Sequence, residues 1–593
     1  MSCDKLVFDL SQEIEGTPNV FVKKDWLNIL DNQNQNYSSN QSVIDTSQLS
    51  NSNKYMSYRE AYFMIPMMLT LSTANGVFTP RGGATSSDYA MGLKNWFGSI
   101  IHSFTLDYMG TTIIQQTPFI NMWNAFKLMT SLSWNDVITQ GSTIGFYPDD
   151  PLAWGYFDST NGNSRNGAGT LNNSTTAPAS GIMQANPLTS FNTYTATNGN
   201  LGFTKRIQYI NFDIDATPNG NIPYSDFLPQ ISVNNLWKSY IFNKQSTNNS
   251  GLLQIAVSAT VYLKQVHSFF AMCPLLKGVF MKMTMNLNNC SSSISVTGTN
   301  NQLSPSTAVT LISSSVPVGG VLPMMLASTN STTFQGAGNL GGITNSVNPA
   351  TYLMTLSVGG RCLNATVATR GDYQPSPLAQ SVYLYVPAYT FNPVFEQAYL
   401  SSPIKQIKYT DVYQYQVLNV GANQQFNNLI TNGIANIKSV LILPYFSASA
   451  GAQNTGLPQG VPVYQSPFDP AGCGCTSPLC LLTNFNVVIS GQNAIYNTER
   501  YAFEQFNNQL YGQNAVNGGL TDGLTSSLIN SLGFEMEYCY YYVNVSRMLP
   551  VEESVPKSVQ IIGTNCSGSA VDLFVFIEYG CDISIDILSG ARV

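Results

Sequence analysis

Three cysteines lie close together in the stretch CGCTSPLC: Cys473, Cys475 and Cys480. Thiolates at short spacing are ligands for Zn²⁺, which takes four ligands, commonly from paired Cys-x-x-Cys units. Here there are three thiols at an unusual spacing, with no histidine nearby in the sequence. The pattern favours loop thiols or a disulfide, and a zinc site is the alternative.

The chain has two histidines, His102 and His267, which are its only candidates for imidazole general-base catalysis. His102 begins a predicted strand, and His267 precedes the apolar stretch SFFAMCPLL. The sequence pairs neither histidine with a nucleophilic Ser or Cys, and the nucleophile elbow G-x-S-x-G is absent. Both histidines are therefore expected to be structural.

Two pairs of acids alternate along predicted strands, which places each pair on one face. Asp213 and Asp215 precede ATPNGN and suggest Ca²⁺, but the spacing D-x-[DN]-x-[DN]-G is not met. Glu535 and Glu537 are placed as glycosidase acids are on sandwiches, although such a pair is commonly a solvated edge. We expect no catalytic, cofactor-binding or metal-binding residues, and no cofactor.

Glycosylation sequons occur in the chain, for example at Asn173, Asn330 and Asn565. A chain so rich in Asn, Ser and Thr produces sequons by composition alone. The N-terminus MSCDKLVFDLSQ has acids and no apolar core of a secretory signal. We therefore expect the sequons to be unused and the ten cysteines to be mostly free thiols in a reducing compartment.

Length and composition limit the classes of protein to which this chain can belong. The 593 residues are 44% hydrophobic and only 10% charged, with a net charge of −7. This length predicts more than one domain with packed cores. The longest basic run is the pair Lys23-Lys24, which argues against direct nucleic-acid binding. The longest apolar run, residues 61–71, is too short to span a bilayer.

One short pattern occurs twice, about 380 residues apart. FTLDYMGTTIIQQTPF (104–119) and FNVVISGQNAIYNTER (485–500) both place a Phe six residues before a Gly and thirteen before a Thr. Each is consistent with a strand, a tight turn at Gly110 or Gly491, a returning strand and a helix, with Thr117 or Thr498 as the N-cap. The repeat predicts two copies of one β-rich domain.

The rest of the chain is consistent with antiparallel sandwiches, because alternating apolar segments are separated by turn-rich loops and few helices. The predicted strands are 58–71, 206–214, 252–264, 279–287, 351–358, 381–390, 405–420, 534–546, 558–564 and 571–588. Pro66, inside the first of these, is expected at an edge or a bulge. A short helix and Pro403 mark a boundary near residues 392–405.

The predicted organisation is an N-terminal arm and loop over 1–57, a first domain over 58–400 and a second over 401–593. Two insertions, 158–200 and 290–350, lengthen the first domain. Their Asn, Ser, Thr and Gly residues offer too little apolar surface to form a core. We expect them to cluster at the outer end of the first domain and to contact neighbouring subunits as a tower.

Several phrases together resemble the major capsid proteins of virophages and Polinton-like viruses. They are VPAYTFNPVFEQAYLSSPIKQIKYTDVY, SVLILPYF, SPFDPAGCGCTSP and NVVISGQNAIYNTERYAFEQF, and the resemblance covers most of residues 58–593. It implies an all-β fold of two eight-stranded antiparallel jelly rolls in tandem, with short helices and long surface loops. Some members of this lineage, which includes adenovirus hexon, carry a C-terminal extension that a viral protease removes. The chain ends at ISIDILSGARV, so it either lacks that extension or is the mature form.

The resemblance also implies the function: a non-enzymatic major capsid protein forming pseudo-hexameric homotrimers that tile an icosahedral virion shell. Implied partners are the protein itself, penton proteins and minor capsid proteins, with assembly inside the infected host cell. The alternatives are another virion β-protein, a penton or receptor-binding spike, and a carbohydrate-active β-sandwich enzyme. A penton would usually carry one jelly roll, so the internal repeat favours the capsomer.

Overall fold

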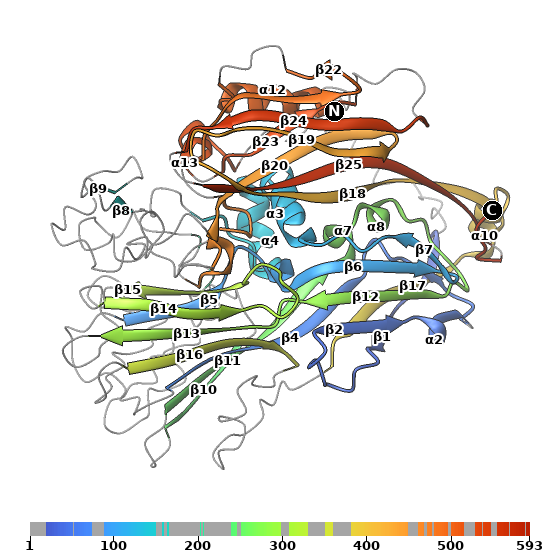
Figure 1. Ribbon diagram of the computed structural model, residues 1–593. Coiled ribbons are helices and arrows are strands. Elements are labelled where there is room, and N and C mark those ends of the chain that lie inside the picture. Colours follow the sequence, from blue (N-terminus) through green and yellow to red (C-terminus); the bar gives the residue numbers. More distant parts are fainter. Residues whose placement is uncertain are drawn as a thin grey trace, which may run out of the picture.

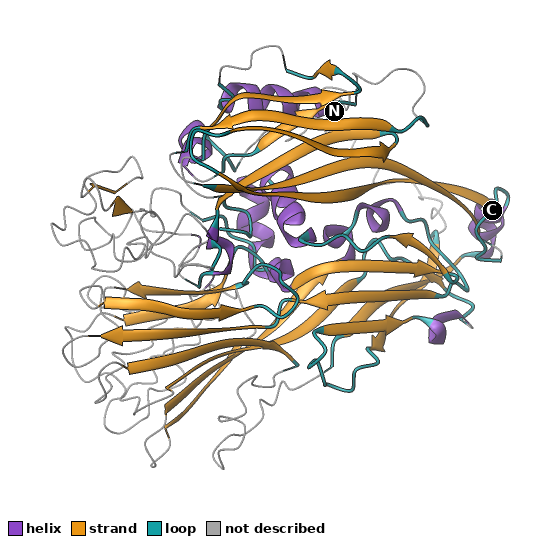
Figure 2. Ribbon diagram, in the orientation of Figure 1, coloured by secondary structure: helices purple, strands orange, loops and turns teal. Residues whose placement is uncertain are grey.

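The protein was analysed as a computed structural model of all 593 residues. The structure describes most of two β-sandwiches and the helices between them (Figures 1 and 2). The described residues are 19–50, 52–73, 88–149, 157–158, 163–164, 202, 206, 239–245, 251–297, 308–329, 350–359, 381–448, 461–467, 471–476, 480–495, 500–514, 528–536, 538–546, 554–567, 570–587 and 589–593.

The second sandwich consists of two four-stranded antiparallel sheets. Its strands are β18 (Ile404–Val420), β19 (Gln425–Ile434), β20 (Ile437–Phe446), β21 (Leu482–Ile489), β22 (Gln492–Asn493), β23 (Tyr541–Asn544), β24 (Lys557–Asn565) and β25 (Val571–Asp586). The sheet orders are β18-β25-β20-β23 and β19-β24-β21-β22. Counted in chain order, these are strands 1-8-3-6 facing strands 2-7-4-5. This is the strand order of a jelly roll.

The first sandwich repeats this order. Its eight corresponding strands are β1 (Phe21–Leu30), β2 (Gln41–Asp45), β4 (Tyr62–Thr73), β6 (Ile101–Tyr108), β7 (Thr111–Ile114), β11 (Gly251–Tyr262), β12 (Met281–Leu287) and β17 (Tyr383–Phe391). Pairing runs β1-β17-β4-β11 in one sheet and β2-β12-β6-β7 in the other, again 1-8-3-6 and 2-7-4-5. The predicted fold of two antiparallel jelly rolls in tandem is confirmed.

The repeated sequence pattern occupies the same place in both sandwiches. Gly110 lies between strands four and five of the first, and Gly491 between strands four and five of the second. Their φ angles are 82° and 84°, and the preceding residues, Met109 and Ser490, both have φ of 48°. Two consecutive positive φ angles are typical of the tight hairpin turn that matches strand twist. The predicted duplication is therefore confirmed at this turn.

The predicted N-terminal arm over residues 1–57 is wrong for the described residues. Strand β1 pairs along its length with β17, and β2 pairs with β12. Two short elements follow, α2 (Ser47–Ser50) and β3 (Tyr55–Met56). The polar composition concealed β2 because only Ser42 and Ile44 face inward, and the outward residues alternate with them.

The larger sheet of the first sandwich extends beyond the jelly roll. The strands added to this sheet are β10 (Ser239–Gln245), β13 (Cys290–Thr297), β14 (Ala308–Ser315) and β16 (Ala350–Val358), while β5 (Asp88–Leu93) and β15 (Met324–Thr329) form a separate two-stranded sheet. Figure 1 shows them together at one end of the molecule. The prediction that residues 290–350 contribute no core is wrong, because Ile294, Leu311 and Met324 are buried there. The insertion 158–200 lies outside the described residues, apart from residue 158 and β9 (Asn163–Ser164); β8 (Phe157–Asp158) pairs with β9.

Pro66 was expected at a strand edge or a bulge, but it lies within strand β4 and not at an edge. Residues 62–64 of β4 pair with β17, whereas residues 67–73 pair with β16. Pro66 therefore stands where β4 changes partner on that side. Its missing N–H costs no ladder bond there, and its carbonyl accepts a hydrogen bond from the Gly359 N–H at 2.8 Å.

Helices fill the space between the two sandwiches and cap their ends (Figure 2). They are α3 (Ile120–Ser131), α4 (Trp134–Ile144), α7 (Leu263–Val266), α8 (Ser268–Met272), α10 (Pro393–Leu400), α12 (Phe503–Asn514), α13 (Ser531–Met536), and the 3₁₀ turns η1 (Phe97–Ile100) and η6 (Val463–Gln465). The prediction that Thr117 is the N-cap of α3 is wrong, because the helix begins after Phe119. Thr498 lies outside the described residues.

Candidate functional site: the seam between the two jelly rolls

The candidate functional site is the seam, the contact region between the two sandwiches. We define it by the first-sandwich helices α3, α7 and α8 and by the β18-β25-β20-β23 sheet of the second sandwich. Figure 1 shows these helices lying against that sheet. Helix α3 follows the hairpin β6–β7, and α7 and α8 follow β11, so the connections after strands five and six build the first sandwich's side.

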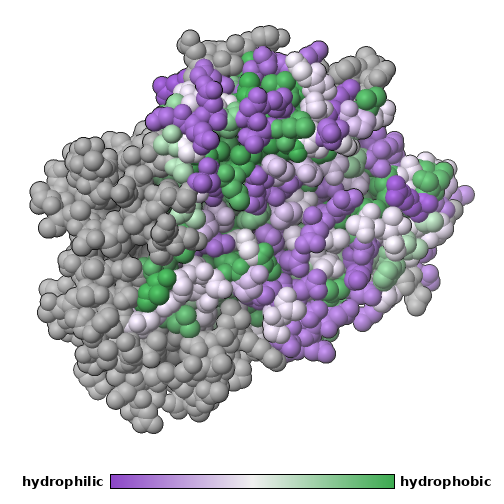
Figure 3. Space-filling view, viewed as in Figure 1, coloured by the Kyte–Doolittle hydropathy of each residue, from purple (hydrophilic) through white to green (hydrophobic). Residues whose placement is uncertain are grey.

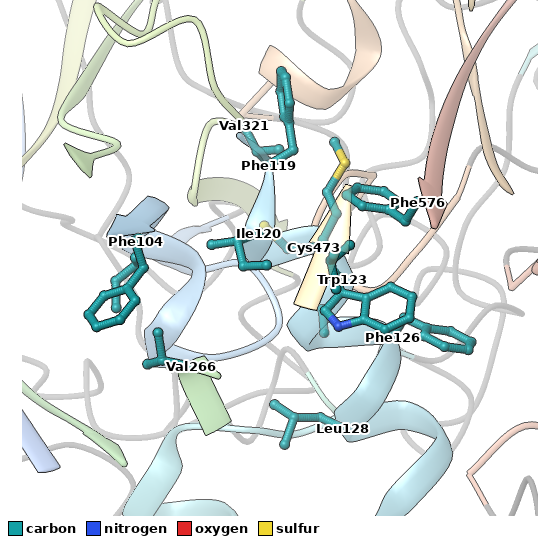
Figure 4. Close-up of a cluster of buried hydrophobic side chains, with 14 of the residues drawn as sticks. Phe104, Phe119, Ile120, Trp123, Phe126, Leu128, Val266, Val321, Cys473 and Phe576 are labelled. Atoms are coloured by element: carbon teal, nitrogen blue, oxygen red, sulfur yellow. The ribbon is translucent and has the colours of Figure 1, made fainter. Parts of the chain in front are cut away.

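Aromatic side chains pack across the seam from both sandwiches. Phe119 meets Phe574 with ring centroids 4.9 Å apart and an interplanar angle of 72°, and Phe126 stacks on Tyr542 at 5.5 Å. Trp123 and Phe576 are 6.1 Å apart. Figure 4 shows Trp123, Phe126 and Phe576 pointing toward one another. Nine of the twelve residues of α3 are buried, so the two sandwiches share one continuous core.

Side chain to backbone hydrogen bonds cross the same seam. The Thr117 hydroxyl donates to the carbonyl of Val412 at 2.7 Å, and the Tyr409 hydroxyl donates to the carbonyl of Ile113 at 2.9 Å. The Thr410 N–H donates to the Ser268 hydroxyl at 3.0 Å. These bonds fix the register between β18 and the first sandwich, which apolar contacts alone do not specify.

Two polar pairs also span the seam. His267 Nε2 lies 3.3 Å from Asp411 Oδ1, and both side chains are buried. Lys127 Nζ lies 3.7 Å from Glu578 Oε1, and Glu578 also accepts a 2.8 Å hydrogen bond from the Ser439 hydroxyl. A buried carboxylate is tolerated only when it is paired and hydrogen-bonded. Both acids of the second sandwich therefore have partners that hold the two sandwiches together.

A cavity of about 230 Å³ opens at the seam, lined in part by Lys127, Lys264 and His267. Lys127 lies over the ring of Trp123 and Lys264 over that of Tyr262, at 5.5 Å each. Lys264 is thus held within the first sandwich, whereas Lys127 also reaches Glu578 across the seam. The cavity marks the solvent edge of the seam.

The structure buries the three clustered cysteines individually. Cys473, Cys475 and Cys480 are all buried, and none of them is in a disulfide. Burial raises the pKa of Cys473 to about 11, which favours the thiol over the thiolate at neutral pH. The Cys475 thiol lies 3.7 Å from Asp149 Oδ2 as a donor. In the described part of the chain, no group of three or more His, Cys, Asp or Glu side chains is placed to hold a metal ion.

The two histidines lie apart, at different structural positions. His102 is the second residue of β6, is buried, and meets the ring of Phe119 edge-on at 4.9 Å; burial lowers its pKa to about 4. His267 is the N-cap of α8, where its Nδ1 accepts the Phe269 N–H at 3.2 Å. Each has a structural contact that accounts for it.

The acidic pairs are not brought together as sites. Asp213, Asp215 and Glu537 lie outside the described residues. Glu535 lies on helix α13, whereas the sequence predicted a strand. Both of its carboxylate oxygens accept hydrogen bonds from the Arg500 guanidinium at 2.9 Å. Strand β23 begins only at Tyr541.

The sequon at Asn565 is not available as a glycan acceptor in the folded chain. Its side chain is buried, and its amide donates to the carbonyls of Val420 and Gly421 at 3.0 Å each. Asn173 and Asn330 lie outside the described residues. Across the described helices, none combines the length and apolar content needed to cross a membrane.

Comparisons with known proteins were made on the whole chain. No family model matches the sequence, and no curated protein matches it. The fold is similar to a chain in the cryo-EM structure of the Sputnik virophage, with 11% identity, a TM-score of 0.45, and coverage of 98% of this chain and 90% of that one. It is also similar to the mavirus major capsid protein (9% identity, TM-score 0.41, coverage 99% and 92%) and the Faustovirus major capsid protein (9%, 0.40, 98% and 94%).

The sequence predicted a helix after the glycine hairpin at Gly110 but did not indicate what the helix packs against. In the structure, α3 buries residues all around its circumference, including the polar Asn121 and Asn124, because both sandwiches cover it. Buried asparagines are not marked as core by their residue type, so this signal was absent from the sequence.

Proposed function

We propose that this protein is a major capsid protein, a structural subunit that assembles into homotrimers with six similar lobes and, through them, into a closed virion shell. The observation that carries the proposal is the pair of jelly rolls with identical strand order, fused by a continuous core in one chain. Two like lobes per chain give six around a threefold axis, which is the outline that tiles a hexagonal lattice.

The seam supports a rigid building block. Aromatic packing, backbone-directed hydrogen bonds and two polar side-chain pairs all fix the angle between the sandwiches. A lattice subunit requires that angle to be constant, because errors accumulate around a closed shell. We propose a domain boundary at residues 392–405, where α10 and Pro403 separate β17 from β18.

The exposed surface suits self-association more than capture of a charged ligand. Large apolar side chains are exposed on both sandwiches, including Trp26, Leu30, Leu418 and Leu429. Figure 3 shows apolar residues interspersed with polar ones over the upper sandwich on the viewed face. We infer a structural role without catalysis, with penton and minor capsid proteins as further partners and assembly inside the infected cell.

We also propose that the extension built on β13, β14 and β16 forms the outer end of the capsomer. It continues the β4–β11 sheet past the jelly roll and gathers at one end (Figure 1). The other predicted insertion, residues 158–200, belongs to the same proposed tower at the outer end. Deleting residues 160–195 is expected to weaken trimers while each jelly roll stays folded. A deletion variant that trimerises and melts like the parent would refute the tower.

Electron microscopy of the purified full chain tests the function. We expect particles with threefold symmetry and six lobes, and curved or flat hexagonal arrays at high concentration. Isolated two-lobed particles at all concentrations would contradict a capsomer. A carbohydrate-active enzyme would give such particles.

A further inference from the structure

The cavity at the seam has walls from both sandwiches, and most of its lining is apolar. Helices α3, α7 and α8 form the wall of the first sandwich, and strand β18 forms the wall of the second. The apolar side chains of the lining are Ile120, Trp123, Leu128, Val266, Ala271 and Val412. Pockets that hold small molecules are lined in this way, with a few polar groups that fix the ligand's orientation. The walls therefore favour a ligand with an apolar body.

The charge of the lining is positive. The described residues that line the cavity include two lysines, Lys127 and Lys264, and no aspartate or glutamate. Lys127 is matched by Glu578, which lies 3.7 Å away. Lys264 is exposed, its ammonium group lies 5.5 Å from the ring of Tyr262, and it forms no ion pair within the described part of the chain. This unmatched charge at the solvent end of the cavity favours an anionic group there.

One polar group of the lining lacks a partner. His267 already uses both ring nitrogens, one toward Asp411 and one as acceptor for the Phe269 N–H. The amide of Asn124 donates to a backbone carbonyl of α7. In contrast, the Gln265 Oε1 atom is buried and has no hydrogen-bond partner among the described residues. A side-chain amide offers donors as well as an acceptor, so by rotating it can also bind a carboxylate.

The volume of the cavity limits the size of a ligand. A closed apolar cavity of about 150 Å³ holds benzene, so about 230 Å³ has room for about nine non-hydrogen atoms. An inorganic anion of this charge would leave the apolar walls without contacts. A neutral hydrocarbon would leave the charge of Lys264 and the amide of Gln265 unmatched. Only a molecule that combines an apolar body with an anionic group meets all three features.

We propose that the seam cavity is a binding site for a small monocarboxylate with an apolar body. The carboxylate lies at the solvent end, against Lys264 and the Gln265 amide, and the body lies between Trp123 of the first sandwich and Val412 of the second. The site adds ligand binding to the proposed structural role and does not depend on it, because all of its residues belong to one chain.

The probe is heptanoate, whose size matches the cavity, titrated into the full chain and followed by ligand-observed NMR. We expect one saturable site per chain with a dissociation constant of about 0.1–5 mM, the range for a ligand this small. Heptan-1-ol has the same apolar body without the charge and should bind about fivefold more weakly, because an exposed ion pair contributes that much at most. Inorganic phosphate, which has charge without an apolar body, should not compete with heptanoate.

Three substitutions test where the probe binds. Ala271→Leu places a larger side chain in the cavity and should abolish heptanoate binding, and Ser131→Phe, at an exposed position of the lining, provides a second block. Lys264→Gln should weaken heptanoate about fivefold and leave heptan-1-ol unchanged. Lys282→Gln, at an exposed position of β12 outside the cavity, is the matched control and should bind heptanoate as the parent does. Circular dichroism and melting temperature establish that each variant is folded.

Four results would overturn the proposal: no heptanoate binding by the parent up to 20 times the upper expected dissociation constant, unchanged binding by folded Ala271→Leu or Ser131→Phe, equal affinity for heptan-1-ol, or displacement of heptanoate by phosphate. The second result would move the site elsewhere, and the last two would remove the carboxylate and the apolar body from the ligand class. None of these results bears on the proposed capsid role, because heptanoate binding is measured equally well on a monomer and on a trimer.

Discussion

The rings of Trp123 and Phe576 lie 6.1 Å apart, one on helix α3 of the first jelly roll and the other on strand β25 of the second. Phe576 is fully buried, although it points out of its own sandwich. The core of this protein therefore runs through the boundary between its domains, and the two jelly rolls are mechanically one object.

Removing a ring from the seam should destabilise both sandwiches together. Phe576→Ala is expected to lower the free energy of unfolding by about 3–5 kcal/mol, the range for deleting a buried aromatic side chain. Guanidinium unfolding followed by fluorescence and circular dichroism measures it. Trp134→Ala, at an exposed position, should change the free energy by less than about 0.5 kcal/mol. Two separate transitions, with only one shifted by Phe576→Ala, would argue against a shared core.

The two hairpin glycines should be equally intolerant of a side chain. A Cβ at Gly110 or Gly491 would meet nothing within 4 Å, so the cost of alanine comes from the positive φ alone. Gly110→Ala and Gly491→Ala are each expected to cost about 1–2 kcal/mol of unfolding free energy. Gly433→Ala is the control, because Gly433 also has open space but no positive φ. A loss at Gly433 as large as at the other two would rule out this explanation.

Acid should weaken the fold through His102. Burial lowers the pKa of His102 from 6.5 to about 4, so between these values the unfolded chain binds more protons than the folded chain. Stability from the neutral imidazole is complete above pH 6.5 and is lost progressively toward pH 4, by about 3 kcal/mol in total. In His102→Phe, the dependence of the unfolding free energy on pH across this window should shrink by that amount. An unchanged pH dependence would mean that His102 does not titrate as described.

Asn565 is predicted to be a structural amide and not a glycan site. Asn565→Ala leaves the carbonyls of Val420 and Gly421 without their donor and is expected to cost about 2–4 kcal/mol. Asn432→Ala, at an exposed position of β19, should cost little. Thermal melts give the difference, and intact mass of the protein expressed through a secretory route reports the glycan. A glycan on Asn565 of folded protein would contradict the burial.

The sequence predicted the strands best where apolar residues are dense, as along β25 and β17. It failed for β2, whose only inward residues are Ser42 and Ile44, and for β14, where Ile312 is exposed and breaks the alternation. It also failed at Glu535, because FEMEY is consistent with either period over so short a stretch.

The seam was the hardest part to predict. Periodicity shows that a helix face is apolar but does not say which sheet covers it, and the hydrogen bonds of Thr117 and Tyr409 go to backbone carbonyls that sequence does not mark. Such contacts depend on tertiary placement. The repeated glycine hairpin, by contrast, is local, and its position was evident from residue types alone.

Sedimentation equilibrium of the purified full chain across the micromolar range tests the central claim most directly. One chain is 64.6 kDa, so a trimer is 3 × 64.6 = 193.8 kDa. The proposed function predicts a single species at this trimer mass. A parent protein that remains a stable 64.6 kDa monomer throughout this range would contradict it.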